Sequence, residues 1–356
     1  MKRRTAVFGF LCVVTCLSHS TSFGVDTSRK VKIFILAGQS NMEGKAKVEL
    51  LEYQMNQPET RSFFRHLQKD GQWVERDDVW INFLDRKGKL AVGFGSPNRI
   101  GPELEFGNTI GDYFKEQVLI IKTAWGGKSL GRDFRPPSSG LPSEEKLQEI
   151  VRKTNERNKK RKRPEVTLEE VRDMYGQYYR EMMKEIKTTL REIKIRFPEY
   201  EGQDYEIAGF VWFQGWNDMF DPDFRVNYGK HMANFIRDVR KDLDISALPF
   251  VIGQMGQGGP EGASDKMQPI KDAQASMEAV PEFKGNVKVV KTDIFWDRKA
   301  AALVKDWRDH VVEWNRVGSD YGYHYLGSAI TFSKIGRAFG EAMLELMKTQ
   351  NDKTLR

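Results

Sequence analysis

The 356-residue sequence predicts an α/β protein in which a parallel sheet has helices on both faces. Short apolar runs with the length of buried strands alternate along the chain with longer patterns at helical spacing. The apolar fraction of 39%, which includes 12% aromatic residues, is ample for a large core. We therefore expect one domain over residues 25–356, preceded by a signal peptide.

The first 24 residues have the features of an export signal. Lys2, Arg3 and Arg4 precede an apolar stretch over residues 6–17, and small residues lead up to Gly24. The stretch is too short to span a membrane. We expect cleavage after Gly24 and export to the periplasm or the cell exterior, without stable membrane insertion.

Both cysteines, Cys12 and Cys16, fall in this signal, so we expect a mature protein without disulfides. Lipidation of Cys16 is the less favoured alternative, because Thr15 is an unusual residue before a lipidated cysteine. Removal of the signal takes away three basic residues and no acidic one, which lowers the formal net charge from +7 to +4. This charge does not indicate a nucleic-acid partner.

Five apolar runs are predicted to form the parallel strands: from Lys32 to the turn at Ser40, then 118–123, 207–213, 249–253 and 287–292. Residues 79–84 are predicted as a strand beside or outside the main sheet. Helical patterns cover 101–107, 167–195, about 226–243, about 270–280 and 332–347.

Residues 133–164 are rich in proline, serine and charge, and we expect a long loop or insertion there. Basic residues concentrate at 152–153 and 157–163. Such a run is usually a solvated helix or a mobile insertion. A contact for an anionic polysaccharide or cell-surface polymer is the alternative.

Three of the predicted strands end in unusual turns, which are Gly38-Gln39-Ser40-Asn41, Trp125-Gly126-Gly127 and Gln214-Gly215-Trp216-Asn217-Asp218. In a parallel sheet these turns share one edge. Each turn alone has a structural explanation, and the residues from Ser40 to Glu43 also fit a capping box. Together the turns supply a nucleophile, a glycine N–H and a side-chain amide, which are the groups that acyl transfer needs.

A serine nucleophile at Ser40 needs a base, and histidine suits neutral pH. We favour His324, which lies in a loop before the last helix, and His310, in a helical pattern, is its rival. The other histidines lie in the signal, in a charged insertion and within a helical pattern, as His19, His66 and His231.

These blocks, Gly38–Met42, Gly126–Gly127, Gly215–Asp218 and His324, resemble those of the SGNH hydrolases. The resemblance is to the branch of sialate O-acetylesterases and family-six carbohydrate (acetyl xylan) esterases. It implies a three-layer α/β/α sandwich with a parallel, flavodoxin-like sheet, no metal or cofactor, and removal of O-acetyl groups from carbohydrate through an acyl-enzyme.

By matched position, the resemblance implies Ser40 as nucleophile and His324 as base. It also implies an oxyanion hole formed by the Ser40 N–H, Gly127 and the amide of Asn217. The third block departs from the family pattern Trp-x-Gln-Gly-Glu, because Trp216 follows Gly215 here. Gln214 is therefore a further candidate donor.

The family places an aspartate three residues before its histidine, where this sequence has Tyr321. We predict that Asp320, one residue earlier, orients His324. Asp293, Asp297 and a dyad without a carboxylate remain alternatives.

Gln39, Trp125, Trp216 and Tyr323 are expected to contact an acetylated polysaccharide or a sialic-acid-type sugar, since aromatic rings stack on sugar faces. A non-catalytic exported carbohydrate-binding protein on the same fold is the alternative function. It would not need Ser40 and His324 to meet. A phosphate or nucleotide binder is disfavoured, because the first turn is poor in the Ser, Thr and Gly that cradle phosphates.

Overall fold

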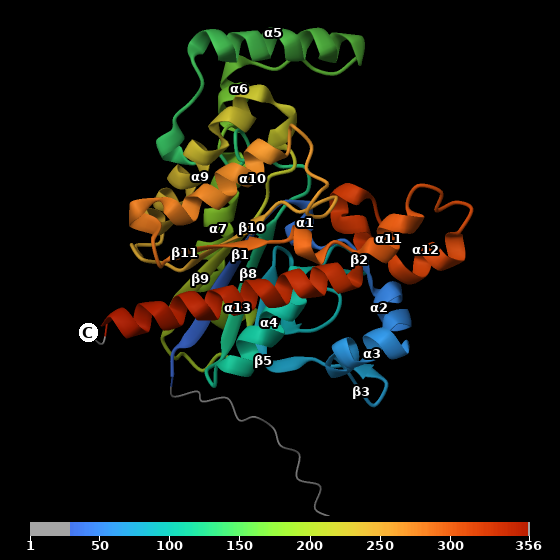
Figure 1. Cartoon of the computed structure of the whole chain (residues 1–356). Helices are drawn as coiled ribbons and strands as arrows, with labels where there is room; N and C mark the ends of the chain where they lie inside the picture. The colour runs from blue at the N-terminus through green and yellow to red at the C-terminus, as the bar shows by residue number, and fades with distance from the viewer. Residues whose placement is uncertain (1–28, 355–356) are drawn as a thin grey trace, which may run out of the picture.

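The computed structural model describes residues 29–354 (Figure 1). A central sheet has helices packed against each face, so the predicted α/β/α fold class is confirmed. The predicted signal peptide, its cleavage after Gly24 and both cysteines lie outside the described residues. No helix between residues 29 and 354 is long and apolar enough to cross a membrane.

The central sheet has the strand order β11-β10-β9-β1-β8-β5-β6. Its strands are β1 (Val31–Gly38), β5 (Arg76–Phe83), β6 (Arg86–Leu90), β8 (Val118–Ala124), β9 (Tyr205–Phe213), β10 (Phe250–Gln254) and β11 (Val287–Lys291). All neighbours run parallel except β5 and β6. The five strands predicted from apolar runs have the order β8-β1-β9-β10-β11, which is the flavodoxin-like order.

The prediction that residues 79–84 lie beside or outside the main sheet is wrong. Residues 79–83 belong to β5, which pairs with β8 so that Val79 lies opposite Val118. Val79 and Ile81 are buried in the core on one face of the sheet, and Trp80 is buried in the core on the other. A strand that buries both faces belongs inside a parallel sheet. The charged strand β6 forms the edge instead.

Alternate residues of β1 supply the two cores, as the period of a strand requires. Ile33 and Ile35 pack in the core on one face of the sheet, while Phe34 and Leu36 pack in the core on the other face. The helices are α1 (Ser40–Glu43), α2 (Val48–Met55), α3 (Pro58–Phe64), α4 (Pro102–Tyr113), α5 (Glu144–Lys160), α6 (Leu168–Met174), α7 (Gln177–Arg191), α8 (Ile193–Arg196), α9 (Pro222–Asp242), α10 (Gln268–Ala275), α11 (Arg298–Leu303), α12 (Val311–Val317) and α13 (Ala329–Thr354).

Shorter elements connect these layers. The 3₁₀ helices are η1 (Arg65–Leu67), η2 (Pro137–Ser139), η3 (Asp218–Phe220), η4 (Ser276–Ala279), η5 (Pro281–Phe283), η6 (Asp293–Phe295) and η7 (Gly322–Gly327). Two small antiparallel pairs join β2 (Ala46–Lys47) to β7 (Arg99–Ile100) and β3 (Gln68–Lys69) to β4 (Gln72–Trp73).

The predicted insertion over residues 133–164 contains α5, which projects from one end of the molecule together with α6 (Figure 1). Leu147 on α5 forms a small separate core with Val171 and Tyr175. The continuous helix expected over residues 167–195 is broken at Gly176, which has a left-handed φ of 72°. The break lets α6 pack on α5 while α7 packs on the sheet.

Candidate active site

Ser40 lies at the carboxyl end of the central strand β1. It is the first residue of the one-turn helix α1, and it is 6% exposed. Gln39 occupies the N-cap position, and no side chain caps the helix, so the capping-box interpretation of residues 40–43 is wrong. Glu43 instead directs its carboxylate away from α1. The Ser40 hydroxyl has no hydrogen-bond partner among residues 29–354.

The turn after β1 is tied to the turn after β9. The N–H of Gln39 donates to Phe213 O, and the Gln39 side chain accepts from Gly215 N at 3.2 Å. Gly38 is required between them, because a Cβ there would lie 2.1 Å from Phe213 O. Gln39, predicted to contact substrate, is 2% exposed and holds these two turns together.

Gly127 and Asn217 come together from the turns after β8 and β9. A Cβ built on Gly127, whose φ is 73°, would lie 3.7 Å from Asn217 Nδ2. The Asn217 amide is partly exposed and has no hydrogen bond to another described residue. It is therefore free to donate to a bound group. Gly126 is fixed by its N–H, which donates to Glu43 Oε1 at 2.6 Å.

Gln214 does not have a free donor. Its two amide hydrogens bind Lys128 O at 2.9 Å and Asp218 Oδ2 at 2.6 Å. Asp218 also accepts from the N–H groups of Leu130 and Gly131, so it fastens the segment after β8 to the turn after β9. Burial raises the pKa of Asp218 to about 6, against the opposing effect of these hydrogen bonds.

His324 lies in η7 with its Nδ1 3.0 Å from Asp320 Oδ1. Because a carboxylate only accepts, Nδ1 carries the proton and Nε2 is left as the acceptor. Nε2 has no hydrogen-bond partner among the described residues. Asn41 Nδ2 donates to Tyr323 O at 3.1 Å, which fastens the residue after Ser40 to the residue before His324. The direct bond from Ser40 to His324 is not formed, as is common in enzymes without bound substrate.

The backbone of η7 explains how an aspartate four residues before the histidine reaches it. Tyr325 and Leu326 both have left-handed φ values, 50° and 59°. The chain curls back, so that the N–H groups of Ser319 and Asp320 donate to Leu326 O. The buried Tyr325 hydroxyl holds the curl by accepting from Gly256 N at 2.9 Å and contacting the Thr292 hydroxyl at 2.6 Å.

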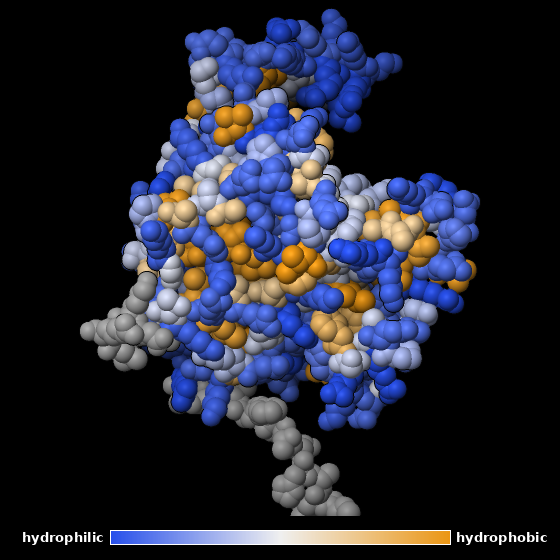
Figure 2. Space-filling model, in the orientation of Figure 1, coloured by the Kyte–Doolittle hydropathy of each residue, from blue (hydrophilic) through white to orange (hydrophobic). Residues whose placement is uncertain are grey.

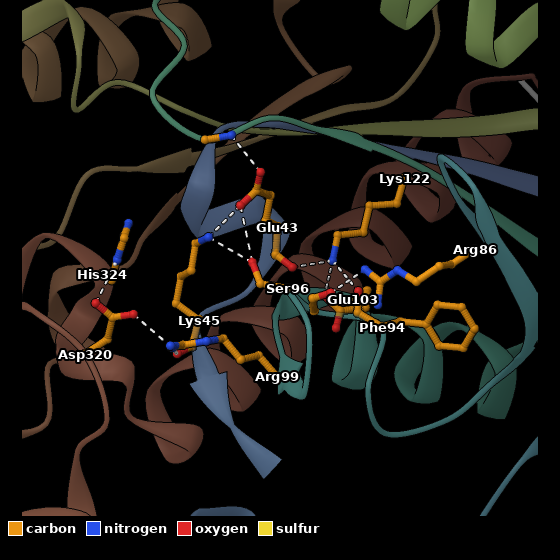
Figure 3. A network of polar contacts seen from close by, with 12 residues as sticks. Glu43, Lys45, Arg86, Phe94, Ser96, Arg99, Glu103, Lys122, Asp320 and His324 are labelled. Carbon is orange, nitrogen blue, oxygen red and sulfur yellow. Dashed lines mark hydrogen bonds and ion pairs between the residues drawn. The ribbon is translucent and has the colours of Figure 1, made fainter.

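Figure 3 shows a polar network that continues from His324 through Asp320. Arg99 donates to Asp320 Oδ2 at 2.8 Å, and the N–H of Tyr321 donates to Oδ1 at 2.7 Å. Burial alone would raise the pKa of Asp320, but the contacts with His324, Tyr321 and Arg99 hold it below its ordinary value. Arg99 was missed in the sequence because no local pattern links it to a residue 221 positions away.

The rival residues have other partners. Asp293 forms a buried ion pair with Lys271 at 2.8 Å, and Asp297 caps α11 and accepts from the Ser328 hydroxyl. His310 occupies the N-cap position of α12, with half of its side chain exposed and Asp306 at 3.7 Å. His66 and His231 bind Glu105 and Ser139. Neither Asp293 nor Asp297 contacts His324.

Aromatic side chains extend across the surface beside His324. Tyr321 stacks on Tyr323 with centroids 5.2 Å apart, Tyr323 lies 5.9 Å from Trp216, and Trp216 lies 6.0 Å from Phe220. We call these four residues the aromatic row. Tyr321 and Phe220 were missed, although exposed aromatic residues next to a polar motif are a usable signal. Trp125 instead packs on Phe134 and Tyr178, so it is only partly available.

The site offers a hydroxyl, an imidazole paired with a carboxylate, and amide donors at one sheet edge. No group of three or more His, Cys, Asp or Glu that could hold a metal occurs within residues 29–354. A cavity of about 860 Å³ lies elsewhere, between α2–α3 and α11–α12, and its lining includes Tyr53, Trp296 and the rival acid Asp297, but not Ser40, Asp320 or His324. The candidate site therefore rests on its side-chain chemistry and not on the volume of a cavity.

Comparison with known proteins gives a matching family and a relative of similar sequence. Residues 30–297 match the family described as carbohydrate esterase, sialic acid-specific acetylesterase. An Arabidopsis thaliana protein named as a probable carbohydrate esterase is 32% identical over 73 residues, which are 20% of this chain and 26% of that protein. The match thus spans about a quarter of the relative's length.

A solved structure of another protein shares the overall fold. An Arabidopsis thaliana protein superposes with a TM-score of 0.50 at 16% identity, covering 89% of this chain and 98% of the other. A carbohydrate acetylesterase from Xanthomonas citri gives a TM-score of 0.48 at 13% identity, over 87% of this chain and 55% of that one. NanS gives 0.48 at 12% identity, over 92% and 98%.

Proposed function

Because the chain belongs to the carbohydrate esterase family of sialic acid-specific acetylesterases, we propose that it removes O-acetyl groups from carbohydrate as a serine esterase. The observation that carries the serine mechanism is the 3.0 Å contact between His324 Nδ1 and Asp320, which leaves Nε2 free at the edge where Ser40 lies. A carbohydrate-binding protein without catalysis would not need this arrangement.

The reaction runs in two halves. In the first, His324 Nε2 takes the proton from the Ser40 hydroxyl as the oxygen attacks the acetyl carbonyl. The tetrahedral intermediate then collapses, the C–O bond to the sugar breaks, and His324 returns the proton to the sugar oxygen. In the second half, His324 takes a proton from water as the water oxygen attacks the acetyl-serine. The bond to the Ser40 oxygen then breaks, His324 returns the proton to that oxygen, and acetic acid leaves and ionises to acetate.

The oxyanion of each intermediate would be held by the N–H groups of Ser40 and Gly127 and by Asn217 Nδ2. Asn217 suits this role because its side-chain amide has no hydrogen-bond partner among the described residues. Gln214, in contrast, donates both of its amide hydrogens to Lys128 O and Asp218 Oδ2. Donors fixed before the reaction stabilise the developing charge most, because they need no reorganisation. The aromatic row would supply the surface on which the sugar rests.

Replacing the nucleophile tests the proposal. Ser40→Ala should abolish hydrolysis of an aryl acetate and of acetylated polysaccharides, with an unchanged melting temperature because Ser40 caps no helix. Mass spectrometry of the wild-type protein quenched during turnover should detect one acetyl group on Ser40. Hydrolysis by Ser40→Ala at the wild-type rate would exclude this mechanism. Sugar binding without hydrolysis by the wild type would favour the non-catalytic alternative.

We also propose export before function. The basic start, the apolar stretch and the small residues up to Gly24 support cleavage there. Mass spectrometry of protein from the native host should find Val25 as the first residue. An intact Met1, or a lipid on Cys16, would contradict this proposal.

A further inference from the structure

A second polar cleft, of about 520 Å³, lies between the insertion helix α5 and the start of α9. Its size is within the range of small-molecule sites, roughly 300–1,000 Å³. Six cationic side chains line it, compared with three acidic ones. The cations are Arg132, Arg135, Lys146, Lys153, Arg157 and Lys230, and the acids are Glu149, Asp221 and Asp223.

The acids of this basic cleft are already engaged. Glu149 pairs with Lys146 and with Lys153, the latter at 2.6 Å. Asp223 also lies 3.3 Å from Lys146. Asp221 accepts from backbone N–H groups at the start of α9.

Three cations of the cleft have no carboxylate partner among residues 29–354, namely Arg135, Arg157 and Lys230. Arg157 and Lys230 are exposed and come from different helices, α5 and α9. Since no described acid neutralises these three charges, the cleft is suited to an anion supplied from outside.

Arg135 is the most informative of the three because it is half-buried. Its guanidinium donates to Gly131 O at 2.9 Å, to the carbonyl oxygens of Ser139 and Gly140, and contacts His231 Nε2 at 3.1 Å. Burial lowers the pKa of Arg135, and burial with the charges of Arg135 and Lys230 lowers the pKa of His231 to about 4. His231 is therefore neutral at neutral pH and adds no charge to the cleft. A partly dehydrated guanidinium held only by neutral groups favours an anionic partner.

The basic cleft is connected to the candidate active site through the segments that form both. Arg132 and Arg135 follow the turn that carries Gly127, and Asp221 follows the turn that carries Asn217. Asp218 joins these segments through the N–H groups of Leu130 and Gly131. The cleft and the catalytic candidates thus lie at the carboxyl edge of the sheet. Figure 2 shows that hydrophilic residues cover most of the projecting end formed by α5.

We propose that the basic cleft binds an anionic group of the substrate chain, a sugar carboxylate or a sulfate ester, at a distance from the acetyl ester. The natural substrate would then be an acetylated acidic polysaccharide rather than a neutral one. This inference rests on the proposed function. Arg157 supplies the planar, bidentate donors that match carboxylate and sulfate oxygens. Arg135 adds a fixed charge with one N–H not used by its four contacts inside the protein, and Lys230 adds a point charge from α9.

Binding to the inactive Ser40→Ala protein tests the proposal without turnover. The probes are an oligogalacturonate, a chondroitin sulfate oligosaccharide and a neutral xylo-oligosaccharide of equal length, titrated by calorimetry at physiological salt. One of the two acidic probes should bind at least about tenfold more tightly than the neutral one, and which one does so identifies carboxylate or sulfate as the group. Equal binding of all three would overturn the proposal.

Two double variants with the same loss of charge locate the contact. Arg157→Gln with Lys230→Gln should weaken binding of the preferred acidic probe by about tenfold or more. Lys160→Gln with Arg163→Gln removes two exposed charges of the same insertion that do not line the cleft, and should change binding by less than about twofold. All four positions are exposed, so both variants should fold, which circular dichroism checks. Equal weakening of probe binding in both double variants would show non-specific charge attraction and refute the proposed binding site in the cleft.

A DNA oligonucleotide of matched charge is the final probe. Binding as tight as that of the acidic glycan would identify a general polyanion surface and overturn the glycan site. Aryl acetate hydrolysis by the wild type tests the proposed function separately, because this small ester has no anionic group for the cleft to bind. If Ser40→Ala loses that activity and all glycans bind equally, the proposed esterase function is supported and only the proposed anion site in the cleft is refuted.

Discussion

At the scale of single residues, the orientation of His324 depends on a carboxylate that is itself held from two sides. Asp320 binds Nδ1 with one oxygen and Arg99 with the other, and both side chains of the His324–Asp320 pair are largely buried. Arg99 lies on the short strand β7, so an element distant in sequence fixes the acid. If Asp320 is the orienting acid, Nε2 of His324 is presented in the one tautomer that can accept a proton.

Asp320→Asn should lower kcat by several orders of magnitude, roughly 10⁴-fold, with KM little changed. The asparagine amide would favour the wrong tautomer of His324 and would not stabilise the His324 imidazolium that forms during the reaction. Steady-state kinetics with an aryl acetate measures both constants. Asp293→Asn is the matched control and should lose much less activity, since Asp293 contacts Lys271 and not His324. A collapse in the control with near-normal turnover in Asp320→Asn would move the role to Asp293.

The same substitution has a pH signature in stability. The pKa of Asp320 is lower in the folded protein than its ordinary value of about 4. The Asp320 carboxylate therefore contributes fully to the free energy of unfolding above about pH 4. This contribution is lost as the pH falls through the lowered pKa. Urea denaturation should find a lower free energy of unfolding for Asp320→Asn than for the wild type at about pH 7. The difference between the two proteins should be smaller at about pH 3. A constant difference across this range would contradict the assignment.

At the scale of elements, the first turn of the site is organised by Glu43 at the end of α1. One carboxylate oxygen accepts from Gly126 N, and the other pairs with Lys45 at 2.6 Å and accepts from Ser96 (Figure 3). The first of these contacts positions the Gly126–Gly127 turn against α1. Glu43 thus acts on the proposed oxyanion hole through the backbone of its neighbour.

Glu43→Ala should lower kcat by up to about 100-fold, because a donor displaced by a fraction of an ångström loses much of its effect on the transition state. KM should change little, since Glu43 is not expected to touch the sugar. Glu43→Gln keeps an acceptor for Gly126 and should retain most of the activity. An equal loss in both variants would show that the charge, rather than the position of the turn, matters.

Elements were predictable from the sequence where the signal was local. Four of the five apolar runs form strands that bury both faces, and the fifth, β11, is a partly buried edge strand. The last helix packs closely on α4 because Gly336 and Gly340 leave room for it. A Cβ on Gly336 would lie 2.2 Å from Pro102 O. The place of residues 79–84 was not predictable, because pairing with β8 is a long-range choice among several buried strands.

In the candidate site, too, residues in local motifs were predictable and contacts between distant segments were not. Ser40, Gly127 and Asn217 are the ends of local motifs, so the sequence could name them. The spacing from Ser40 to Glu43 fitted a capping box equally well. Only the folded structure shows that Gln39 is the N-cap, that no side chain caps α1 and that Glu43 accepts from Gly126 N instead. The pairing of Asp320 with His324 depends on left-handed backbone at Tyr325, which is rare for residues other than glycine and has no sequence signature here.

At the scale of the whole molecule, a buried ion pair joins the central sheet to the layer that carries the site. Lys122 on β8 is fully buried, and its ammonium donates to Glu103 at 2.7 Å, to Glu43 O at 2.8 Å and to Phe94 O at 2.9 Å. All three hydrogens are thus satisfied (Figure 3). Burial lowers the pKa of Lys122, against the attraction of Glu103. The pair holds β8, α1 and α4 together at the base of the site.

Glu103→Gln should lower the free energy of unfolding by about 3–5 kcal/mol, because it leaves an uncompensated ammonium in the core. Adding Lys122→Met should recover part of this loss. Urea denaturation of the three proteins measures the coupling. Glu156→Gln, which removes an exposed ion pair with Arg152, is the control and should leave stability within experimental error. A double variant less stable than Glu103→Gln would contradict the account.

The curled loop of η7 also makes activity a late event in folding. Two successive left-handed residues are unfavourable until the Tyr325 hydroxyl reaches Gly256 and Thr292, which follow β10 and β11, the last two strands of the sheet along the chain. On refolding from urea, far-ultraviolet ellipticity should therefore recover before hydrolysis of an aryl acetate, and Tyr325→Phe should lengthen the interval. Newly made chains would pass through a stage in which the sheet is assembled and the base is not yet in place.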